Sequence, residues 1–116
     1  MGKVLVVEDE PRSRRALVSL LKLNGFEAIC ATSLANAIEQ LNAGPRWVLL
    51  DLMLPDGNGA QVVEFIRSHS LPIRVAVTTG ASNWQSLLGR YSSRPDKVFI
   101  KPLDLDGVIA WLTSDS

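Results

Sequence analysis

Five side chains that could do chemistry stand at or just after the ends of short apolar runs in this sequence: Glu8, Asp9, Asp51, Thr79 and Lys101. Carboxylates crowded into one site repel one another unless a cation lies between them, and their hard oxygen atoms suit Mg²⁺. An ammonium group and a hydroxyl beside such a cation could hold an anion. These residue types therefore suggest phosphoryl transfer to a carboxylate, since Asp is a known acceptor of phosphoryl groups.

The apolar runs alternate with segments of helical periodicity, which predicts how these side chains are positioned. We expect strands over 3–7, 27–31, 47–51, 73–77 and 98–100. We expect helices over 12–23, 60–68, 83–91 and 104–112, and one more that Ser33 caps and Gly44–Pro45 ends. This alternation predicts an α/β fold with a five-stranded parallel sheet in the order 2-1-3-4-5 and helices on both faces.

The predicted sheet brings the polar residues together. In an open parallel sheet, ligands bind beyond the carboxyl ends of the strands. The first, third, fourth and fifth predicted strands end in the residues named above, whereas the second offers only Thr32 and Ser33. Because those four strands are neighbours in the predicted order, their ends would form one site. Asp51, at the tip of the third strand, is then placed as its nucleophile.

Composition restricts the function classes. The 116 residues fit one domain, 1–116, and equal numbers of basic and acidic residues, 12 each, give no argument for nucleic-acid binding by it. No apolar run approaches the roughly 20 residues of a membrane span, and no signal peptide is visible, so we expect a cytoplasmic protein. Cys30 is the only cysteine, which excludes an internal disulfide, and we expect it in the core.

Four short motifs resemble those of a known family. In chain order they are VLVVEDE at 4–10, LLDLMLPDGNG at 49–59, VTTGA at 77–81 and KP at 101–102. They are similar to the receiver domain of two-component response regulators, and the resemblance covers nearly the whole chain. The spacings agree too: 42 residues from Asp9 to Asp51, 28 more to Thr79 and 22 more to Lys101. The resemblance implies a flavodoxin-like, CheY-like fold, in agreement with the predicted sheet.

The resemblance also implies a function and a cofactor. Asp51 would accept a phosphoryl group from a sensor histidine kinase or a phosphotransfer protein, with Mg²⁺ bound beside it. Asp9 would bind this Mg²⁺ directly, and Asp51 would be a further ligand. Glu8 would bind it through water, and Met53 through its backbone carbonyl oxygen. The domain would be a phosphoacceptor with its own phosphorylation and dephosphorylation chemistry, not an enzyme.

The remaining site residues follow from the same resemblance. Thr79 would be the switch hydroxyl, and Lys101 would bind the phosphate group and precede a cis bond to Pro102. In many members an aromatic residue three places before this lysine rotates inward on activation. Here Val98 stands at that place. Phe99, the next residue along a strand, must point to the opposite face and cannot take over the role.

Two other function classes fit less well. A non-phosphorylated pseudo-receiver, acting only as a protein-binding module, usually lacks an essential group, and here none of the five groups is missing. A phosphohydrolase with an Asp nucleophile commonly has a second acid two residues later, where this chain has Met53. Phosphorylation by a small phosphodonor would separate the pseudo-receiver from the main interpretation.

Trp84 and Trp111 suggest a surface that a downstream protein reads. The family commonly signals through its fourth helix, fifth strand and fifth helix. Both tryptophans belong to the predicted helices there and lie off the apolar stripes that would face the sheet. We expect an exposed aromatic patch formed by the two side chains, since exposed apolar patches mark partner sites. The alternative is that either side chain folds back over the rim of the core.

Overall fold

The structure, a computed structural model, describes residues 2–114. Its main-sheet strands are β1 (Lys3–Val7), β2 (Glu27–Ala31), β3 (Trp47–Leu50), β6 (Arg74–Thr79) and β7 (Lys97–Ile100). Its helices are α1 (Pro11–Leu23), α2 (Leu34–Gln40), α3 (Ala60–Ser68), α4 (Trp84–Leu88) and α5 (Leu105–Leu112). A 3-10 helix, Leu41–Ala43, follows α2, and a hairpin of β4 (Met53–Leu54) and β5 (Gly57–Asn58) follows β3. All five main-sheet strands are parallel, in the order β2-β1-β3-β6-β7, which confirms the predicted 2-1-3-4-5 order.

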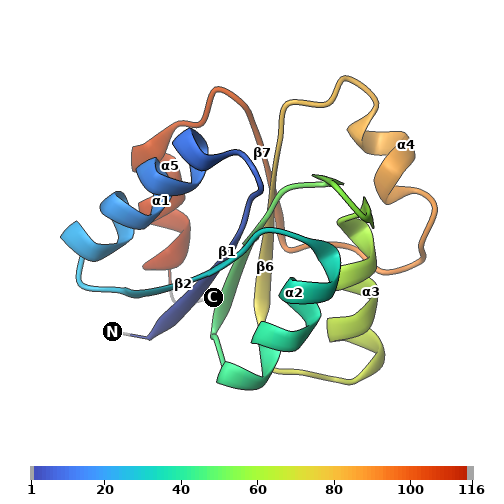
Figure 1. The fold of residues 1–116 in the computed structure, drawn as a ribbon, viewed down its shortest axis with the longest axis horizontal. Coiled ribbons are helices and arrows are strands. Elements are labelled where there is room, and N and C mark those ends of the chain that lie inside the picture. Colours follow the sequence, from blue (N-terminus) through green and yellow to red (C-terminus); the bar gives the residue numbers. More distant parts are fainter. Residues whose placement is uncertain (1, 115–116) are drawn as a thin grey trace.

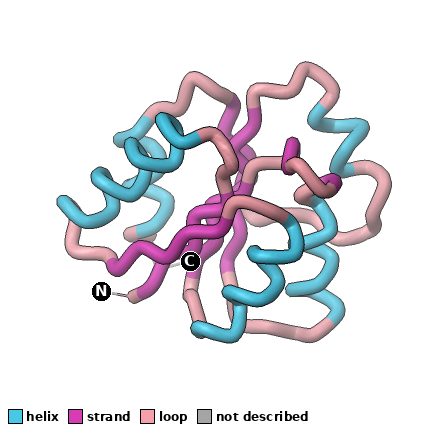
Figure 2. The backbone as a smooth tube through the Cα atoms, in the orientation of Figure 1, coloured by secondary structure: helices cyan, strands magenta, loops and turns pink. Residues whose placement is uncertain are grey.

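Helices cover both faces of the sheet, α1 and α5 on one side and α2, α3 and α4 on the other (Figures 1 and 2). Along β1, Val4 and Val6 belong to the apolar cluster under α1 and α5, while Leu5 and Val7 belong to the cluster under the other three helices. All four side chains are fully buried. This two-sided burial explains why the strand is apolar at successive positions rather than at alternate ones. Within residues 2–114, no helix is long and apolar enough to cross a membrane.

The fourth strand is longer than predicted. It continues past Val77 to Thr79, because its last two residues pair with Phe99 and Ile100 of β7. The side chains of Thr78 and Thr79 are therefore buried at the carboxyl edge of the sheet.

Helix α4 is shorter than the predicted segment 83–91, since it ends at Leu88. Gly89 follows, and glycine is a poor residue for continuing a helix. The Arg94 guanidinium donates a hydrogen bond to the Tyr91 carbonyl at 2.6 Å and so holds the next segment as a loop. The helical prediction for residues 89–91 was therefore wrong.

Cys30 is exposed, so its predicted place in the core was wrong. It belongs to β2, which is an edge strand of the sheet. Residues there are less completely covered than those of the central strands, and only Ala31 of β2 is buried.

Trp84 and Trp111 do not form the single exposed patch that we predicted. Both side chains are partly buried, Trp84 against the cluster under α2, α3 and α4, and Trp111 against the cluster under α1 and α5. Trp111 also meets Phe99 edge to face, with ring centres 6.4 Å apart. The two helices flank opposite faces of the sheet, and Val98 and Phe99 of β7 point to opposite faces as expected. A partner surface that includes both tryptophans is therefore not shown by the structure, and it stays a prediction.

The hairpin lies close to the backbone of Asp51. Gly59, directly after β5, donates its N–H to the Leu52 carbonyl at 2.8 Å. A Cβ atom on Gly59 would lie 2.2 Å from the backbone carbonyl oxygen of Asp51. Because this neighbour is main chain, it cannot rotate away, so a side chain at Gly59 would displace the strand end that carries Asp51.

We therefore expect Gly59→Ala to lower the free energy of unfolding by about 1–3 kcal/mol or more, measured by urea denaturation. Gly80→Ala is the matched control, because a Cβ there would meet only the Lys101 side chain, at 3.7 Å. Equal effects of the two substitutions would show that the close approach at Gly59 does not matter.

Candidate functional site

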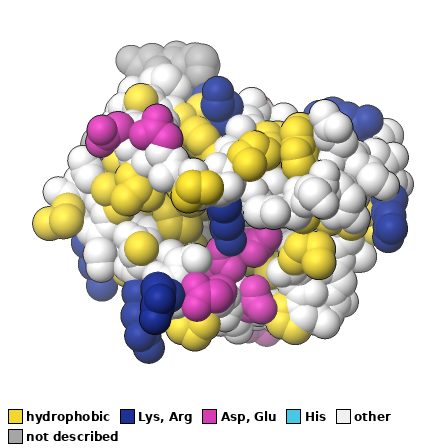
Figure 3. Space-filling view, turned by 90° about the horizontal axis from the view of Figure 1, so that it is seen from above, with side chains coloured by type: hydrophobic (Ala, Val, Ile, Leu, Met, Phe, Trp, Pro, Cys, Tyr) yellow, Lys and Arg dark blue, Asp and Glu magenta, His cyan; other side chains and the backbone are white. Residues whose placement is uncertain are grey.

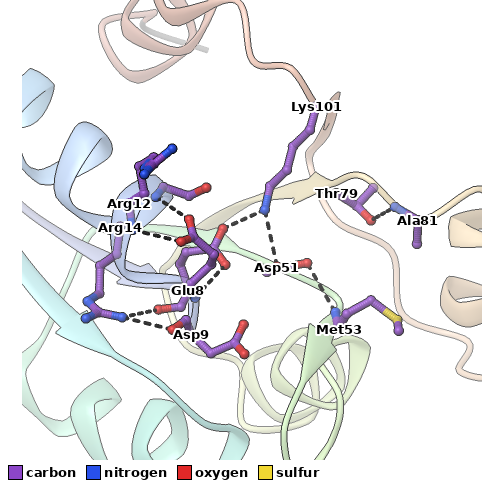
Figure 4. Close-up of polar contacts among 11 residues, drawn as sticks. Glu8, Asp9, Arg12, Arg14, Asp51, Met53, Thr79, Ala81 and Lys101 are labelled. Atoms are coloured by element: carbon purple, nitrogen blue, oxygen red, sulfur yellow. Dashed lines mark hydrogen bonds and ion pairs between the residues drawn. The ribbon is translucent and has the colours of Figure 1, made fainter.

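Three charged side chains from three strand ends meet at the carboxyl edge of the sheet (Figure 4). Glu8 follows β1, Asp51 follows β3 and Lys101 follows β7. The Lys101 Nζ donates hydrogen bonds to Glu8 Oε1 at 2.6 Å and to Asp51 Oδ2 at 3.3 Å. Both carboxylates are buried, whereas 26% of the Lys101 side chain is exposed. The sheet thus brings together residues that are 43 to 93 positions apart along the chain, as predicted.

Asp9 completes a cluster of three carboxylates. One oxygen atom from each of Glu8, Asp9 and Asp51 lies within 4.8 Å of the others. Asp9 is exposed, so the cluster is open to solvent, and Figure 3 shows acidic side chains gathered on this surface. Among the described residues, the cluster has three carboxylates, and one ammonium group, that of Lys101, contacts it. The cluster therefore carries more negative than positive charge. Hard oxygen donors with excess negative charge fit a small divalent cation such as Mg²⁺.

The Asp51 carboxylate is held from two sides. Its Oδ2 accepts the hydrogen bond from Lys101, and its Oδ1 accepts one from the Met53 N–H at 3.1 Å. The backbone of Met53 therefore lies next to the carboxylate, while its side chain is 58% exposed. Two donors on two different oxygens fix the orientation of the carboxyl group, which favours reaction in one geometry.

The turn between β1 and α1 is fixed by Arg14, a residue that our sequence reasoning did not single out. Its guanidinium donates to the backbone carbonyls of Glu8 at 3.1 Å and Asp9 at 3.2 Å. Glu10 has a different role from its two neighbours: its carboxylate caps α1 by accepting from the N–H groups of Arg12 and Ser13. Hydrogen bonds from the backbone of Ser13 and Arg12 lower the pKa of Glu10. The presence of an arginine on the first helix, five residues after Asp9, could have indicated this contact with the turn.

Thr79 is the last residue of β6 and is fully buried. Its hydroxyl oxygen accepts a hydrogen bond from the Ala81 N–H at 3.1 Å. Its carbonyl oxygen accepts from the Lys101 N–H at 2.8 Å, so the hydroxyl and the ammonium group belong to directly bonded strand ends. The bond between Lys101 and Pro102 is cis, as expected.

Burial, hydrogen bonds and neighbouring charges shift the pKa values of two groups in the site, Glu8 and Lys101. Burial raises the pKa of Glu8, and the neighbouring Asp51 charge adds to this, although the hydrogen bond from Lys101 opposes it. Partial burial lowers the pKa of Lys101, but the hydrogen bond to Glu8 and the charges of both acids outweigh it, so this pKa is raised. Glu8 is therefore destabilised as an anion, and Lys101 is kept cationic.

An apolar hollow of about 300 Å³ opens beside Lys101. It lies between α1 and the segment that leads into α5, and its lining residues are Ser13, Ala16, Leu17, Lys101, Pro102, Leu103 and Leu105. Leu105 at its rim is 40% exposed. Hydrophobic side chains accordingly flank the acidic patch on the side of α1 and α5 (Figure 3).

The raised pKa of Glu8 predicts a pH-dependent effect on stability. The stabilising effect of its bound proton is present below the ordinary Glu pKa of 4.5 and is lost as pH rises through the raised value. In metal-free protein, Glu8→Gln should raise the melting temperature at pH 7 by roughly a few degrees, and by less at pH 4. Glu10→Gln is the control and should not raise it, since that pKa is lowered. If Glu8→Gln melted at a lower temperature than the wild-type chain at pH 7, the predicted direction of the stability effect would be wrong.

Comparison with known proteins identifies the family of this site. Residues 4–113 match the response regulator receiver domain. The chain is similar to the phosphate regulon transcriptional regulatory protein PhoB of Escherichia coli, with 31% identity over 111 residues, or 93% of this chain and 48% of that protein. It is 38% identical over 83 residues to the transcription regulator BvgA of Bordetella pertussis, or 68% of this chain and 39% of that protein. The chain thus spans about half or less of these relatives.

Solved structures agree with the sequence match. The response regulator TrrA from Thermotoga maritima, solved in complex with Mg²⁺-BeF, superposes with a TM-score of 0.84 at 26% identity, over 97% of this chain and 96% of that one. A two-component response regulator from Clostridium difficile gives a TM-score of 0.86 at 24% identity, over 97% and 93% of the chains, which supports the fold alone. The chain belongs to the response regulator receiver domain family.

Proposed function

We propose that Asp51 accepts a phosphoryl group and thereby changes a surface that a partner protein reads. The observation that carries this proposal is the Lys101 ammonium group, which lies between Glu8 and Asp51 at 2.6 and 3.3 Å. An ammonium group on a flexible stem can follow negative charge from a carboxylate to phosphoryl oxygens. Family membership supports the proposal, because receiver domains act as phosphoryl acceptors in two-component systems.

In the proposed transfer, an oxygen of Asp51 forms a bond to phosphorus while the bond from phosphorus to the donor breaks. The donor nitrogen of a phosphohistidine keeps the electron pair of the broken bond. The hydrogen bonds from Met53 and Lys101 hold the Asp51 carboxylate in place for this reaction. The natural donor would be a sensor histidine kinase or a phosphotransfer protein in the cytoplasm.

The groups that we propose to hold Mg²⁺ are the carboxylates of Glu8, Asp9 and Asp51 and the backbone carbonyl oxygen of Met53. Asp9 would be a direct ligand and Glu8 a ligand through water. When bound, Mg²⁺ would neutralise negative charge on the carboxylates and on the transferred group. The cluster of oxygen atoms within 4.8 Å and the similarity to TrrA support this cofactor.

Thr79 is proposed as the hydroxyl that responds to phosphorylation. Its oxygen now accepts a hydrogen bond from Ala81, and its proton can be donated to a phosphoryl oxygen. Such a movement would draw the loop after β6 toward Asp51. Val98 supplies no aromatic ring to follow it, so any accompanying rearrangement involves other side chains of this region.

A non-phosphorylated pseudo-receiver remains the second candidate. It would use the same fold as a binding module without chemistry. The three clustered carboxylates with a bridging ammonium group favour the phosphoacceptor, because a purely structural site has no need to bury two acids beside one base. We further propose that the chain is a phosphoacceptor and not an enzyme that turns over a separate substrate.

Incubation with acetyl phosphate and Mg²⁺ should add one phosphoryl group, measured by intact mass. The gain in mass should disappear when a chelator removes the charge-neutralising cation. It should also disappear in Asp51→Asn, because the nucleophile is then missing. Asp56→Asn is the control, since this acid lies in the hairpin outside the carboxylate cluster, and it should still be phosphorylated. Undiminished phosphorylation of Asp51→Asn would refute the proposed acceptor.

The apolar hollow beside Lys101 is where we propose that a protein phosphodonor docks. Its donor group must reach Asp51, and the hollow opens next to the lysine that contacts this residue. Apolar surface close to a polar reaction centre is typical of a partner site. A small phosphodonor would need no such surface.

Leu105→Glu should therefore slow phosphoryl transfer from a phosphorylated histidine kinase by about tenfold, the effect of losing one well-packed interface residue. The rate with acetyl phosphate should stay unchanged. Leu23→Glu is the matched control, because Leu23 is 85% exposed at the far end of α1. Equal slowing with both donors would show that Leu105 acts on the chemistry and not on docking.

A further inference from the structure

Asn58 links the hairpin that follows Asp51 to two helices. Its Oδ1 accepts a hydrogen bond from the Ala60 N–H at the start of α3, at 2.9 Å. Its Nδ2 donates to the backbone carbonyl oxygen of Leu87 in α4, also at 2.9 Å, across 29 residues of sequence. The two halves of one amide group thus have different partners on different helices.

The bond to Leu87 holds the end of a very short helix. α4 has five residues, and carbonyl groups in the last turn of a helix have no partner within it. The Leu87 side chain is buried in the core cluster, while its carbonyl oxygen receives the Asn58 amide. The α4 end is therefore fixed to the hairpin as well as to the sheet.

Asn58 is also close to Asp51 along a chain of direct contacts. The Asp51 Oδ1 accepts from the Met53 N–H at 3.1 Å, and Met53 of β4 is paired with Asn58 of β5. One hydrogen bond, one strand pair and one side-chain hydrogen bond therefore connect the Asp51 carboxylate to Leu87. This route is separate from the one through Thr79, which reaches the loop before α4.

We propose that Asn58 is a positioning residue that transmits the state of Asp51 to α4; this inference rests on the proposed phosphorylation of Asp51. In the unmodified protein, the Asn58 amide holds the Leu87 carbonyl and keeps the end of α4 in place. Phosphorylation of Asp51 turns its carboxylate into an acyl phosphate, whose carbonyl oxygen carries less negative charge. The hydrogen bond from Met53 then weakens, because a charged acceptor binds an N–H more strongly than a neutral one. The hairpin relaxes and Asn58 releases Leu87.

The released helix end borders a second hollow. This hollow has about 330 Å³ and lies between α4 and β7, lined by Trp84, Gln85, Leu88, Gly89, Arg94, Pro95 and Val98. The small side chain of Val98 is one of those that line this hollow. A shift of α4 would change the shape of the hollow without rotation of an aromatic ring at residue 98.

Asn58→Asp separates the two roles of the amide. A carboxylate can still accept from the Ala60 N–H and cap α3, but it cannot donate to the Leu87 carbonyl. Asn58→Ser is a second variant, since its hydroxyl can cap α3 but is too short to replace the amide at Leu87. Asn42→Asp is the matched control, because it makes the same chemical change at an exposed position in the 3-10 helix.

The test is hydrogen exchange of backbone amides in residues 84–91, measured by mass spectrometry with and without acetyl phosphate and Mg²⁺. In the wild-type chain and in Asn42→Asp, phosphorylation should speed this exchange by about fivefold, the effect of losing one hydrogen bond. In Asn58→Asp and Asn58→Ser, exchange should already be fast without phosphorylation and should not respond to it.

Intact mass in the same samples separates two kinds of failure. If the wild-type chain gains no phosphoryl group, the proposed function fails and the inference fails with it. If the chain is phosphorylated but both Asn58 variants still show the full phosphorylation-dependent change, Asn58 only stabilises the fold and the inference alone is overturned. Unchanged exchange in the unmodified Asn58 variants would overturn it as well.

Discussion

The contact of one ammonium group with two buried carboxylates is the interaction on which this structure depends. Glu8 and Asp51 are removed from water at neighbouring strand ends, and without a cation their charges would oppose the fold. Lys101 reaches them from β7, across the intervening strand β6. The parallel sheet is what makes this possible, because it places the carboxyl ends of β1, β3 and β7 at one edge. Removing the lysine would leave two buried acids without their partner.

The same interaction gives the site its capacity to change. The buried carboxylates of Glu8 and Asp51 are stabilised by the Lys101 ammonium group. A change in the charge of Asp51 would therefore change the position that Lys101 prefers. The backbone N–H of Lys101 donates a hydrogen bond to the Thr79 carbonyl, and the N–H of Met53 donates one to the Asp51 carboxylate. In our proposals, a change of charge at Asp51 therefore acts along two paths of hydrogen bonds, one through the loop after β6 and one through the β4–β5 hairpin. Both lead toward α4, one at each end of this short helix.

The sheet and the carboxylate cluster could be predicted from the sequence because their signals are local. A run that is apolar at successive positions, such as that of β1, indicates a strand covered on both faces, and the polar residue after it marks the strand end. Once the strand order is assigned, Glu8, Asp51 and Lys101 must meet. The roles of these residues in phosphorylation stay predictions until chemistry is measured.

The features that could not be predicted depend on contacts between distant segments. Helix α4 ends before Gly89, and the loop after it is held by the hydrogen bond from the Arg94 guanidinium to the Tyr91 carbonyl. Helical periodicity carries no sign of this second contact. The two tryptophans show a related difficulty. Periodicity tells which side of a helix is polar, but not which face of the sheet that helix covers, so Trp84 and Trp111 were assigned to one surface although they lie against opposite clusters.

A crystal structure of this chain with Mg²⁺ and beryllofluoride, which imitates a phosphoryl group, would show whether Asp51 is the acceptor. We expect beryllium bonded to an Asp51 carboxylate oxygen, with the Lys101 Nζ moved from Glu8 to a fluorine atom. We also expect Mg²⁺ bound by Asp9, Asp51 and the Met53 carbonyl oxygen. A structure in which Lys101 stays on Glu8, while Asp51 carries no beryllium under conditions that load other receiver domains, would contradict the proposed role of Asp51.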